Sequence, residues 1–315
     1  NAILTRTDFR GAYLAGANLS GANMDAADLR EGQIMERGEY GLLINKALPS
    51  FPKGKSATTI FTGAKLNDVN MTSVKAMAAD FSDADLSNVI LNRANVSGVN
   101  FDGANLSKVD FTGANLSRAN LSNSILSGAI MRNAEVQDTI LENIIRDAPM
   151  GKRLERGVYT LAELLNTHKE WIASAGKRGH QMDLSGYDLR DIQNLWDYPL
   201  TAVRAVKSTF LGLNLERVNM QSATLDYSDF RDCRLSKSDL RGSSLKGVNF
   251  ARADLTGASL GPLKFDAPDG KGIRLQRSNL SGSSFRFCNL RGCDLRDSIL
   301  MGVDLSNAVL NGCDL

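Results

Sequence analysis

Two histidines and four cysteines are the side chains whose chemistry could serve a metal site or a covalent reaction in this sequence. His168 falls beside Trp171 and Ile172 on the apolar side of an expected helix, so a packed, hydrogen-bonded imidazole is a better interpretation than a catalytic base. His180 follows Lys-Arg-Gly and fits a surface turn. No second ligand stands at zinc-binding spacing from either histidine, so we expect no metal site and no cofactor.

The four cysteines, Cys233, Cys288, Cys293 and Cys313, share one place in a five-residue pattern, a place that holds Ala, Ser or Val elsewhere. A buried thiol that acts as a small apolar side chain explains this placement. Cys293 and Cys313 stand four pentapeptides apart. Their Cα atoms could come within disulfide range, but side-by-side Cβ directions disfavour a bond. Nothing nearby would lower the pKa of these thiols, so we expect no nucleophile.

Phosphate binding and acid–base catalysis are not indicated either. Gly54-Lys55-Ser56 resembles the end of a phosphate-binding loop, but that pattern needs glycine at position 49, where the chain has Pro49. The carboxylates are spread over all sides of the expected fold and form no distinct acid–base pair. Walls of short side chains also leave few concave pockets. We therefore expect that the protein is not an enzyme.

A spacing of five residues, which fits neither a helix nor a flat strand, dominates the chain. Residues 101–121, FDGANLSKVDFTGANLSRANL, have an apolar residue at every fifth position. Five residues turn a helix by roughly 140°, and an odd spacing alternates faces in a strand. Repetition at a fixed period instead indicates a solenoid. Two residues of each pentapeptide point inward: the central Leu or Phe, and the small residue two positions before it. The Asn or Asp between them points outward. Gly103 and Gly113 suit the turn.

The phenylalanines predict how many pentapeptides complete one coil. Three sets recur at every fourth pentapeptide: Phe61, Phe81 and Phe101; Phe210, Phe230 and Phe250; Phe265 and Phe285. Four pentapeptides per coil would stack each set into an aromatic column, with coils about 4.8 Å apart.

Ala-Asp-Leu-Ser at 84–87, Ala-Asn-Leu-Ser at 104–107 and 114–117, and Ala-Asp-Leu-Thr at 253–256 resemble the pentapeptide-repeat family. Similar units recur in tandem over most of the chain. The resemblance implies an all-β solenoid, a right-handed, four-sided (quadrilateral) parallel β-helix, here interrupted by a short α-helical insert.

We expect three parts along the chain. Residues 1–146 form a β-helix with a loop insertion at 35–58, which contains Pro49 and Pro52. Residues 147–180 form an α-helical connector. Residues 181–315 form a second β-helix, with a loop insertion at 261–274 and a one-residue slip near Leu195 that suggests a bulge.

Within the connector, apolar residues at helical spacing predict a helix over 161–173. Thr160 and Glu163 fit a capping box at its start, and Gly176 and Gly179 fit its end. The apolar side comprises Leu161, Leu164, Leu165, His168, Trp171 and Ile172.

Charge argues against two kinds of partner. Lys plus Arg is 37 and Asp plus Glu is 35, a net charge of +2. One branch of the pentapeptide-repeat family inhibits or protects DNA gyrase by imitating DNA. Imitation of DNA needs a strongly acidic rod. Residues 204–260 instead have nine basic and six acidic side chains. Direct binding of nucleic acid would need a continuous basic stripe, whereas Arg286, Arg291 and Arg296 fall on successive sides of a coil.

Apolar residues at outward positions are better candidates for an interaction surface. Ile90, Ile125, Ile130 and Ile140 occupy places that hold Asn or Asp elsewhere. Our hypothesis is that the 161–173 helix folds back onto these isoleucines, with Trp171 packing there. A surface for a partner protein and exposed isoleucines without a role are the alternatives.

The sequence favours a non-enzymatic protein–protein interaction module or rigid scaffold, with an unknown partner and with the two loop insertions and the connector as specificity elements. The alternatives are a DNA-mimicking inhibitor or protector of DNA gyrase, and a targeting or sensory protein whose effector domain precedes residue 1. We also expect a homodimer through an exposed coil end, because an open coil leaves strand edges unpaired. No apolar run approaches the ~20 residues of a membrane span and no basic–apolar signal segment opens the chain, so we expect a cytoplasmic protein.

Overall fold

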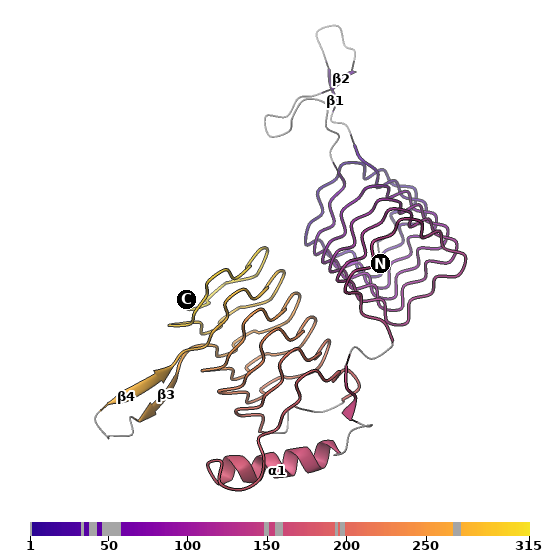
Figure 1. The fold of residues 1–315 in the computed structure, drawn as a ribbon. Helices are drawn as coiled ribbons and strands as arrows, with labels where there is room; N and C mark the ends of the chain where they lie inside the picture. Colours follow the sequence, from indigo (N-terminus) through magenta and orange to yellow (C-terminus); the bar gives the residue numbers. More distant parts are fainter. Residues whose placement is uncertain are drawn as a thin grey trace. The chain divides into compact units, whose positions relative to one another are not determined.

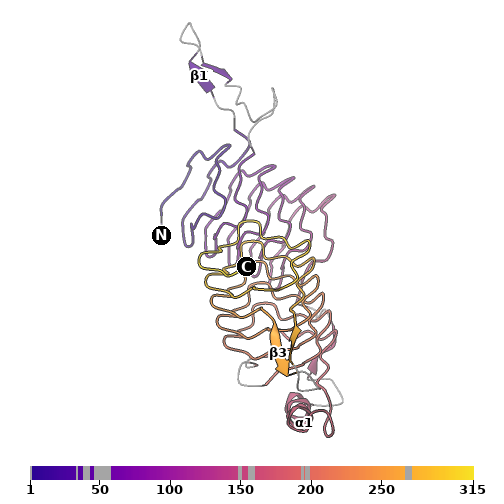
Figure 2. The same cartoon turned by 90° about the vertical axis from the view of Figure 1, so that its left-hand side faces the viewer.

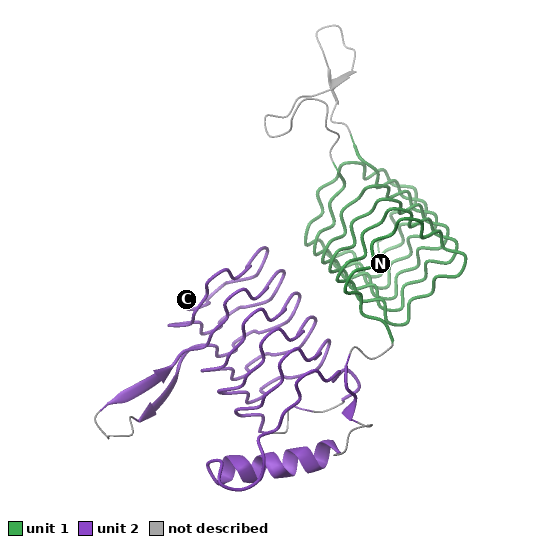
Figure 3. Ribbon diagram, in the orientation of Figure 1, with its two compact units in different colours: residues 1–148 green, residues 149–315 purple. Residues whose placement is uncertain are grey.

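The computed structural model describes residues 2–32, 35–37, 43–45, 58–147, 151–154, 160–192, 195, 199–266 and 272–315. The chain forms two compact units, residues 1–148 (unit 1) and residues 149–315 (unit 2) (Figure 3). Each unit is a right-handed, four-sided parallel β-helix with its own buried core (Figure 1), as the sequence predicts. The separate connector expected at 147–180 stays a prediction.

Parallel backbone bridges join each coil to the next, four pentapeptides further along the chain. Asp85 bridges Asn105, which in turn bridges Ile125. The inward Leu106 donates its N–H to the carbonyl oxygen of Ile125 in the next coil, at 2.8 Å. Sides this short hold their conformation because the backbone of each coil pairs with the coils before and after it.

A tight turn ends every side of the coil. The N–H of Val109 donates back to the carbonyl oxygen of Leu106 at 3.3 Å, and Lys108 between them has a left-handed φ of 56°. Gly103 and Gly113 occupy the same place in their turns at φ values of 69° and 67°, which confirms the predicted role of these glycines.

The outward Asn or Asp of each pentapeptide supports the turn that follows it. Oδ1 of Asn105 accepts the backbone N–H and the hydroxyl of Ser107, at 3.2 and 2.7 Å. Its Nδ2 donates to Asp85 one coil earlier, at 3.2 Å. Asn279 and Ser281 repeat the turn contacts in unit 2. The recurring polar residues are therefore needed by the fold itself.

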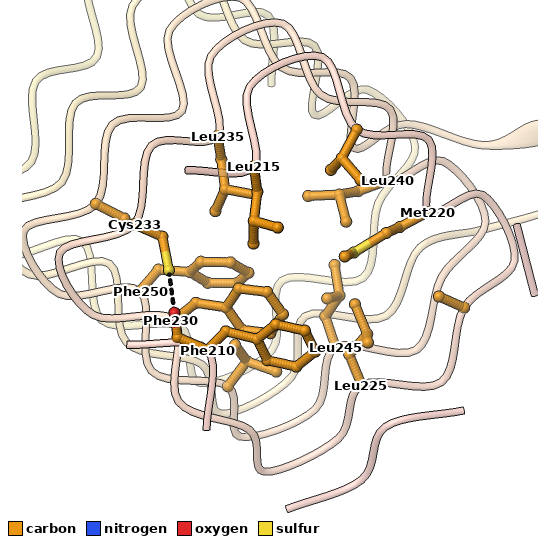
Figure 4. Close-up of a cluster of buried hydrophobic side chains, with 14 of the residues drawn as sticks. Phe210, Leu215, Met220, Leu225, Phe230, Cys233, Leu235, Leu240, Leu245 and Phe250 are labelled. Atoms are coloured by element: carbon orange, nitrogen blue, oxygen red, sulfur yellow. Dashed lines mark hydrogen bonds between the residues drawn. The ribbon is translucent and has the colours of Figure 1, made fainter. Parts of the chain in front are cut away.

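Phenylalanine rings stack inside both units. The ring centroids of Phe61 and Phe81 are 4.8 Å apart, and those of Phe210 and Phe230 are 4.3 Å apart. Figure 4 shows the column in unit 2, which continues to Phe250. These columns confirm a coil of four pentapeptides.

Phe265 does not belong to the column in which its spacing from Phe285 placed it. Phe285 stacks on Phe250 instead, with ring centroids 4.8 Å apart, and Phe265 is 42% exposed. The bridge partners Ser244 and Asn279 are seven pentapeptides apart instead of four. The inserted segment is therefore a whole number of pentapeptides long. It keeps the five-residue spacing, so the spacing alone does not reveal that the coils are interrupted.

Both insertions expected as loops contain a β-hairpin. In unit 1, β1 (Met35–Arg37) pairs antiparallel with β2 (Leu43–Asn45). In unit 2, β3 (Leu263–Asp266) pairs antiparallel with β4 (Ile273–Gln276). Figure 1 shows this hairpin projecting from the side of the coils, and in Figure 2 it lies in front of them. The loop expectation is corrected at these strands. Pro49, Pro52 and residues 54–56 lie outside the described residues.

The first coil of unit 2 contains one extra residue. The bridge from Asp183 to Arg204 spans one residue more than four pentapeptides, whereas the bridge from Pro199 to Asn219 has the usual spacing. This difference confirms the slip expected near Leu195, which is buried in the core of unit 2. A bulge is the usual way to accommodate one extra residue in a ladder.

Helix α1 (Leu161–Ala173) lies at one end of the coil stack of unit 2 (Figure 1). Its capping box forms as predicted: Glu163 donates its N–H to Oγ1 of Thr160 at 3.3 Å, and Thr160 donates its N–H to Oε2 of Glu163 at 2.7 Å. Leu165 is buried in the same core as Met182 and Leu184. The helix therefore covers apolar residues that would otherwise be exposed at the first coil.

Candidate interaction surface

Strands β3 and β4 form an arm, the β3–β4 arm, whose base is fixed to the coil wall of unit 2. Nε2 of Gln276 donates to the carbonyl oxygen of Gly242 at 2.5 Å. A Cβ at Gly242 would lie 2.9 Å from Cβ of Leu263, and the φ of Gly242 is 69°. Glycine at this position therefore permits the close approach of the arm to the wall.

Beyond its base the arm exposes three large apolar side chains. Phe265 is 42% exposed, Ile273 67% and Leu275 45%. Large apolar side chains exposed together on one small element are typical of an interaction surface.

The pairing of the two strands assigns side chains to the two faces of the arm. Lys264 lies opposite Leu275, Asp266 lies opposite Ile273, and these four side chains share one face because opposite residues point the same way. Phe265 lies on the other face, opposite Arg274.

The structure distributes the four outward isoleucines over three walls of unit 1. Ile90 and Ile130 lie on one wall, Ile140 on a second and Ile125 on a third. Ile90 and Ile130 are each 41% exposed and Ile140 is 47% exposed, whereas Ile125 is buried at 2%. Five residues carry the chain to the next wall, so Ile125, Ile130 and Ile140 lie on different walls although they are close in sequence.

Helix α1 uses its apolar side within unit 2. Leu161 and Leu164 pack against the core of that unit beside Leu165. Trp171 stacks on His168, with ring centroids 5.7 Å apart. The outward isoleucines belong to unit 1, so the docking of Trp171 on them stays a prediction.

His168 is buried and hydrogen-bonded on both sides, which confirms that it is a packed histidine. Nδ1 accepts the backbone N–H of Met182 at 3.0 Å, so Nε2 is the nitrogen that carries the proton and donates to the carbonyl oxygen of Thr201 at 3.0 Å. Burial lowers the pKa of this imidazole. Within the described ranges, no group of three or more His, Cys, Asp or Glu side chains could hold a metal ion.

All four cysteines carry free thiols, and three of them are buried. The Cys233 thiol donates to the carbonyl oxygen of Phe210 at 3.0 Å (Figure 4). The Cys288 and Cys293 thiols make the same kind of contact with the preceding coil. Burial raises the pKa of Cys293 to about 12, which is far from the range of a nucleophile. The inward placement expected for these cysteines is confirmed.

Sequence reasoning missed a set of Asp–Arg pairs on the outer walls. The Arg231 guanidinium binds both carboxylate oxygens of Asp229, with a shortest contact of 2.6 Å, and the Arg231 side chain is only 6% exposed. Five more pairs have the same spacing: Asp8–Arg10, Asp28–Arg30, Asp188–Arg190, Asp239–Arg241 and Asp294–Arg296. The arginine is the first residue of the turn that the aspartate supports, as Oδ1 of Asp229 also accepts the backbone N–H of Arg231 at 3.0 Å, so the Asp-x-Arg spacing was a usable signal.

Ion pairing also accounts for two of the three arginines considered for nucleic-acid binding. Arg286 lies 3.8 Å from Asp304, and Arg296 contacts both Asp294 and Asp314. Each cation therefore faces a carboxylate rather than contributing to a basic stripe.

The coil of unit 2 that ends at Leu315 is less buried than the coils before it. Its inward residues Leu300, Leu305 and Leu310 are partly buried, and Leu315 is 63% exposed. Dimerisation through this coil end stays a prediction. Among the described residues, no helix has the length and apolar character needed to span a membrane.

Three solved structures illustrate what the chain is similar to. HetL, a pentapeptide repeat protein involved in heterocyst differentiation regulation from the cyanobacterium Nostoc sp. strain PCC 7120, is 18% identical with a TM-score of 0.22, and the match covers 99% of this chain and 90% of HetL. Full-length QnrB1, a plasmid-mediated fluoroquinolone resistance protein, is 13% identical with a TM-score of 0.21, over 98% and 91% of the two chains. A pentapeptide repeat protein of the Arabidopsis thaliana thylakoid lumen is 25% identical with a TM-score of 0.25, over 40% and 62%. Comparison with curated proteins gives no match.

The family described as pentapeptide repeats matches the coils of both units. Eight copies cover residues 1–32, 79–118, 104–143, 200–236, 233–261 and 274–315. These ranges make up more than half of the chain and leave out helix α1 and strand β3. The chain belongs to the pentapeptide-repeat family.

Proposed function

We propose that the protein is a non-enzymatic interaction module in which a rigid β-helix presents the β3–β4 arm to a partner protein. The exposure of Phe265, Ile273 and Leu275 on one projecting element carries this proposal. The arm is fixed at its base by the contacts of Leu263 and Gln276 with Gly242. It therefore loses less conformational freedom on binding than a free loop would lose.

The coil walls are a poorer candidate for the binding surface. Their Asn and Asp side chains cap turns, as Asn105 does for Ser107, and many of their arginines are paired, as Arg231 is with Asp229. A partner that bound these groups would have to replace contacts already made within the fold. The arm offers apolar area that the fold does not use.

Capture of a partner by the tagged full chain tests the proposal. The triple variant Phe265→Ser, Ile273→Ser, Leu275→Ser should lose proteins that the wild type retains. The matched control is Ile3→Ser with Tyr13→Ser, because these large side chains are also exposed but lie on the coil walls of unit 1. Both variants should melt at the wild-type temperature. Equal capture by the triple variant and the wild type would overturn the proposal.

A supercoiling assay separates this function from imitation of DNA. The chain has a net charge of +2, and Asp–Arg pairs neutralise carboxylates on the walls of unit 2, so the charge of this unit does not resemble that of DNA. We expect gyrase to supercoil plasmid at the same rate with and without the protein. Inhibition at equimolar protein, or rescue of gyrase from a fluoroquinolone, would favour the gyrase function instead.

A further inference from the structure

The outer edge of β3 is open to another strand. Among the described residues, β3 and β4 pair only with each other. Lys264, Phe265 and Asp266 are all exposed. Backbone N–H and C=O groups along such an edge can form ladder hydrogen bonds with an approaching strand.

The side chains of β3 determine which strand fits this edge. Lys264 and Asp266 lie on one face and Phe265 lies on the other. No salt bridge between described residues involves Lys264 or Asp266. The best-matched strand therefore places an acidic residue opposite Lys264, an aromatic residue opposite Phe265 and a basic residue opposite Asp266.

A second copy of β3, running antiparallel, meets each of these requirements. When the two Phe265 residues lie opposite each other, Lys264 of each chain faces Asp266 of the other. A parallel copy in register would instead set like charges opposite each other, and an antiparallel slip of one residue would set Lys264 opposite Phe265. We propose that two chains associate through this edge, so that their arms form one four-stranded antiparallel sheet with two-fold symmetry.

The inference rests on the proposed function, because it names the partner of the β3–β4 arm. The edge of β4 does not compete, since Ile273, Arg274, Leu275 and Gln276 include no acidic residue to face Arg274. Because the pairing uses a short strand, we expect it to bury little surface. Interfaces that bury less than about 1,200 Å² are typical of weak complexes. The dimer should therefore form and dissociate with concentration, and salt should weaken it because its ion pairs are exposed.

Sedimentation of the full chain over a range of concentrations tests the pairing through its charges. Lys264→Asp and Asp266→Lys each replace two attractions by two repulsions, so each should weaken the dimer about ten-fold. The double variant Lys264→Asp, Asp266→Lys restores opposite charges and should return the dissociation constant to within about three-fold of wild type. Lys237→Asp, an equal charge change at an exposed coil corner, should have no effect.

Disulfide trapping tests the register independently of charge. Opposite Cβ atoms in an antiparallel pair are about 5 Å apart, close enough for a disulfide after small adjustment. Phe265→Cys, in a Cys313→Ser background, should yield a covalent dimer on mild oxidation. Leu275→Cys should not, because Leu275 lies on the strand away from the β3 edge.

Three results would overturn the dimer. The first is a strict monomer at the highest concentration reached. The second is an association that neither single charge variant weakens. The third is an association that Leu305→Asp in the last coil abolishes but that both charge variants keep. If one of these results is obtained while the charge variants still capture a different protein and the triple serine variant does not, the dimer is wrong and the proposed function stands.

Discussion

Met182 donates its backbone N–H to Nδ1 of His168, a buried residue of helix α1, and this bond fixes the protonation state of the histidine. A protonated Nδ1 would face the same N–H with a second hydrogen. The neutral imidazole is therefore the form that the folded unit 2 accommodates. Burial independently lowers the pKa of His168, because it removes water from the charged form.

Acid should loosen the attachment of α1. The pKa of His168 is lower in the folded protein than in the unfolded chain, where it is about 6.5, so the unfolded state binds the proton first as the pH falls. The contribution of His168 to stability is therefore full above pH ~6.5 and is lost as the pH falls through the folded pKa. Thermal melting followed by helix circular dichroism between pH 7.5 and 5 should show this loss.

His168→Gln is the test variant for this effect, because an amide can still donate and accept but does not titrate. Its stability should change less with pH over the same range than that of the wild type. His180→Gln, at an exposed position, should leave the wild-type profile unchanged. Identical profiles for His168→Gln and wild type would show that another group controls the acid response.

Position within the stack should decide what a core leucine contributes. Leu106 is buried at 0% between coils, so Leu106→Ala should lower the free energy of unfolding by about 2–5 kcal/mol. Leu141 holds the same pentapeptide place but is 40% exposed in the last coil of unit 1. Leu141→Ala should cost less than about 1 kcal/mol. Urea unfolding of the two variants compares them, and equal costs would contradict the assigned core.

The inward and outward places could be predicted because each is repeated in every coil. The same period explains one error and one difference between closeness in sequence and closeness in space. Phe265 has the correct spacing from Phe285 only because the inserted arm keeps the five-residue frame. Ile125, Ile130 and Ile140 are close in sequence, but each five-residue step moves the chain to another wall. Sequence spacing gives the place within a pentapeptide, and only backbone pairing gives the coil to which a residue belongs.

The helix and the hairpin lie outside the five-residue repeat, so their prediction depended on local sequence signals, which differ in strength. Thr160 and Glu163 mark the start of α1 through a capping box that acts over three residues, so it was predictable. The β3–β4 arm was not, because Pro262, Pro268 and the nearby glycines indicate a loop as readily as a hairpin. Its anchoring depends on the approach of Leu263 to Gly242, a contact between distant parts of the chain.

Two turn glycines with the same backbone should respond differently to alanine. Gly98 and Gly103 have φ values of 65° and 69°, but a Cβ at Gly98 meets nothing within 4 Å, whereas a Cβ at Gly103 would lie 2.5 Å from Oδ1 of Asp83. Asp83 is buried and has little room to move. Gly103→Ala should therefore cost about 1–3 kcal/mol more than Gly98→Ala.

A double-mutant cycle separates the clash at Gly103 from backbone strain. Asp83→Ala removes the obstructing carboxylate, so Gly103→Ala should cost little more in that background than Gly98→Ala costs in wild type. Thermal melting of the four proteins gives the coupling. If Gly103→Ala is equally costly with and without Asp83, the close approach is not the cause.

Thiol labelling should report the lower burial of the coil that contains Cys313. Cys313 is half-buried, whereas Cys233, Cys288 and Cys293 are buried. Burial, and then the charge of Asp314, raise the pKa of Cys313, so its reaction with iodoacetamide should be slow at pH 7 and faster at pH 9. One thiol should react in the native protein and four after unfolding in guanidinium. Cys313→Ser should abolish native labelling, and rapid native labelling of Cys293 would instead show that the last coil detaches.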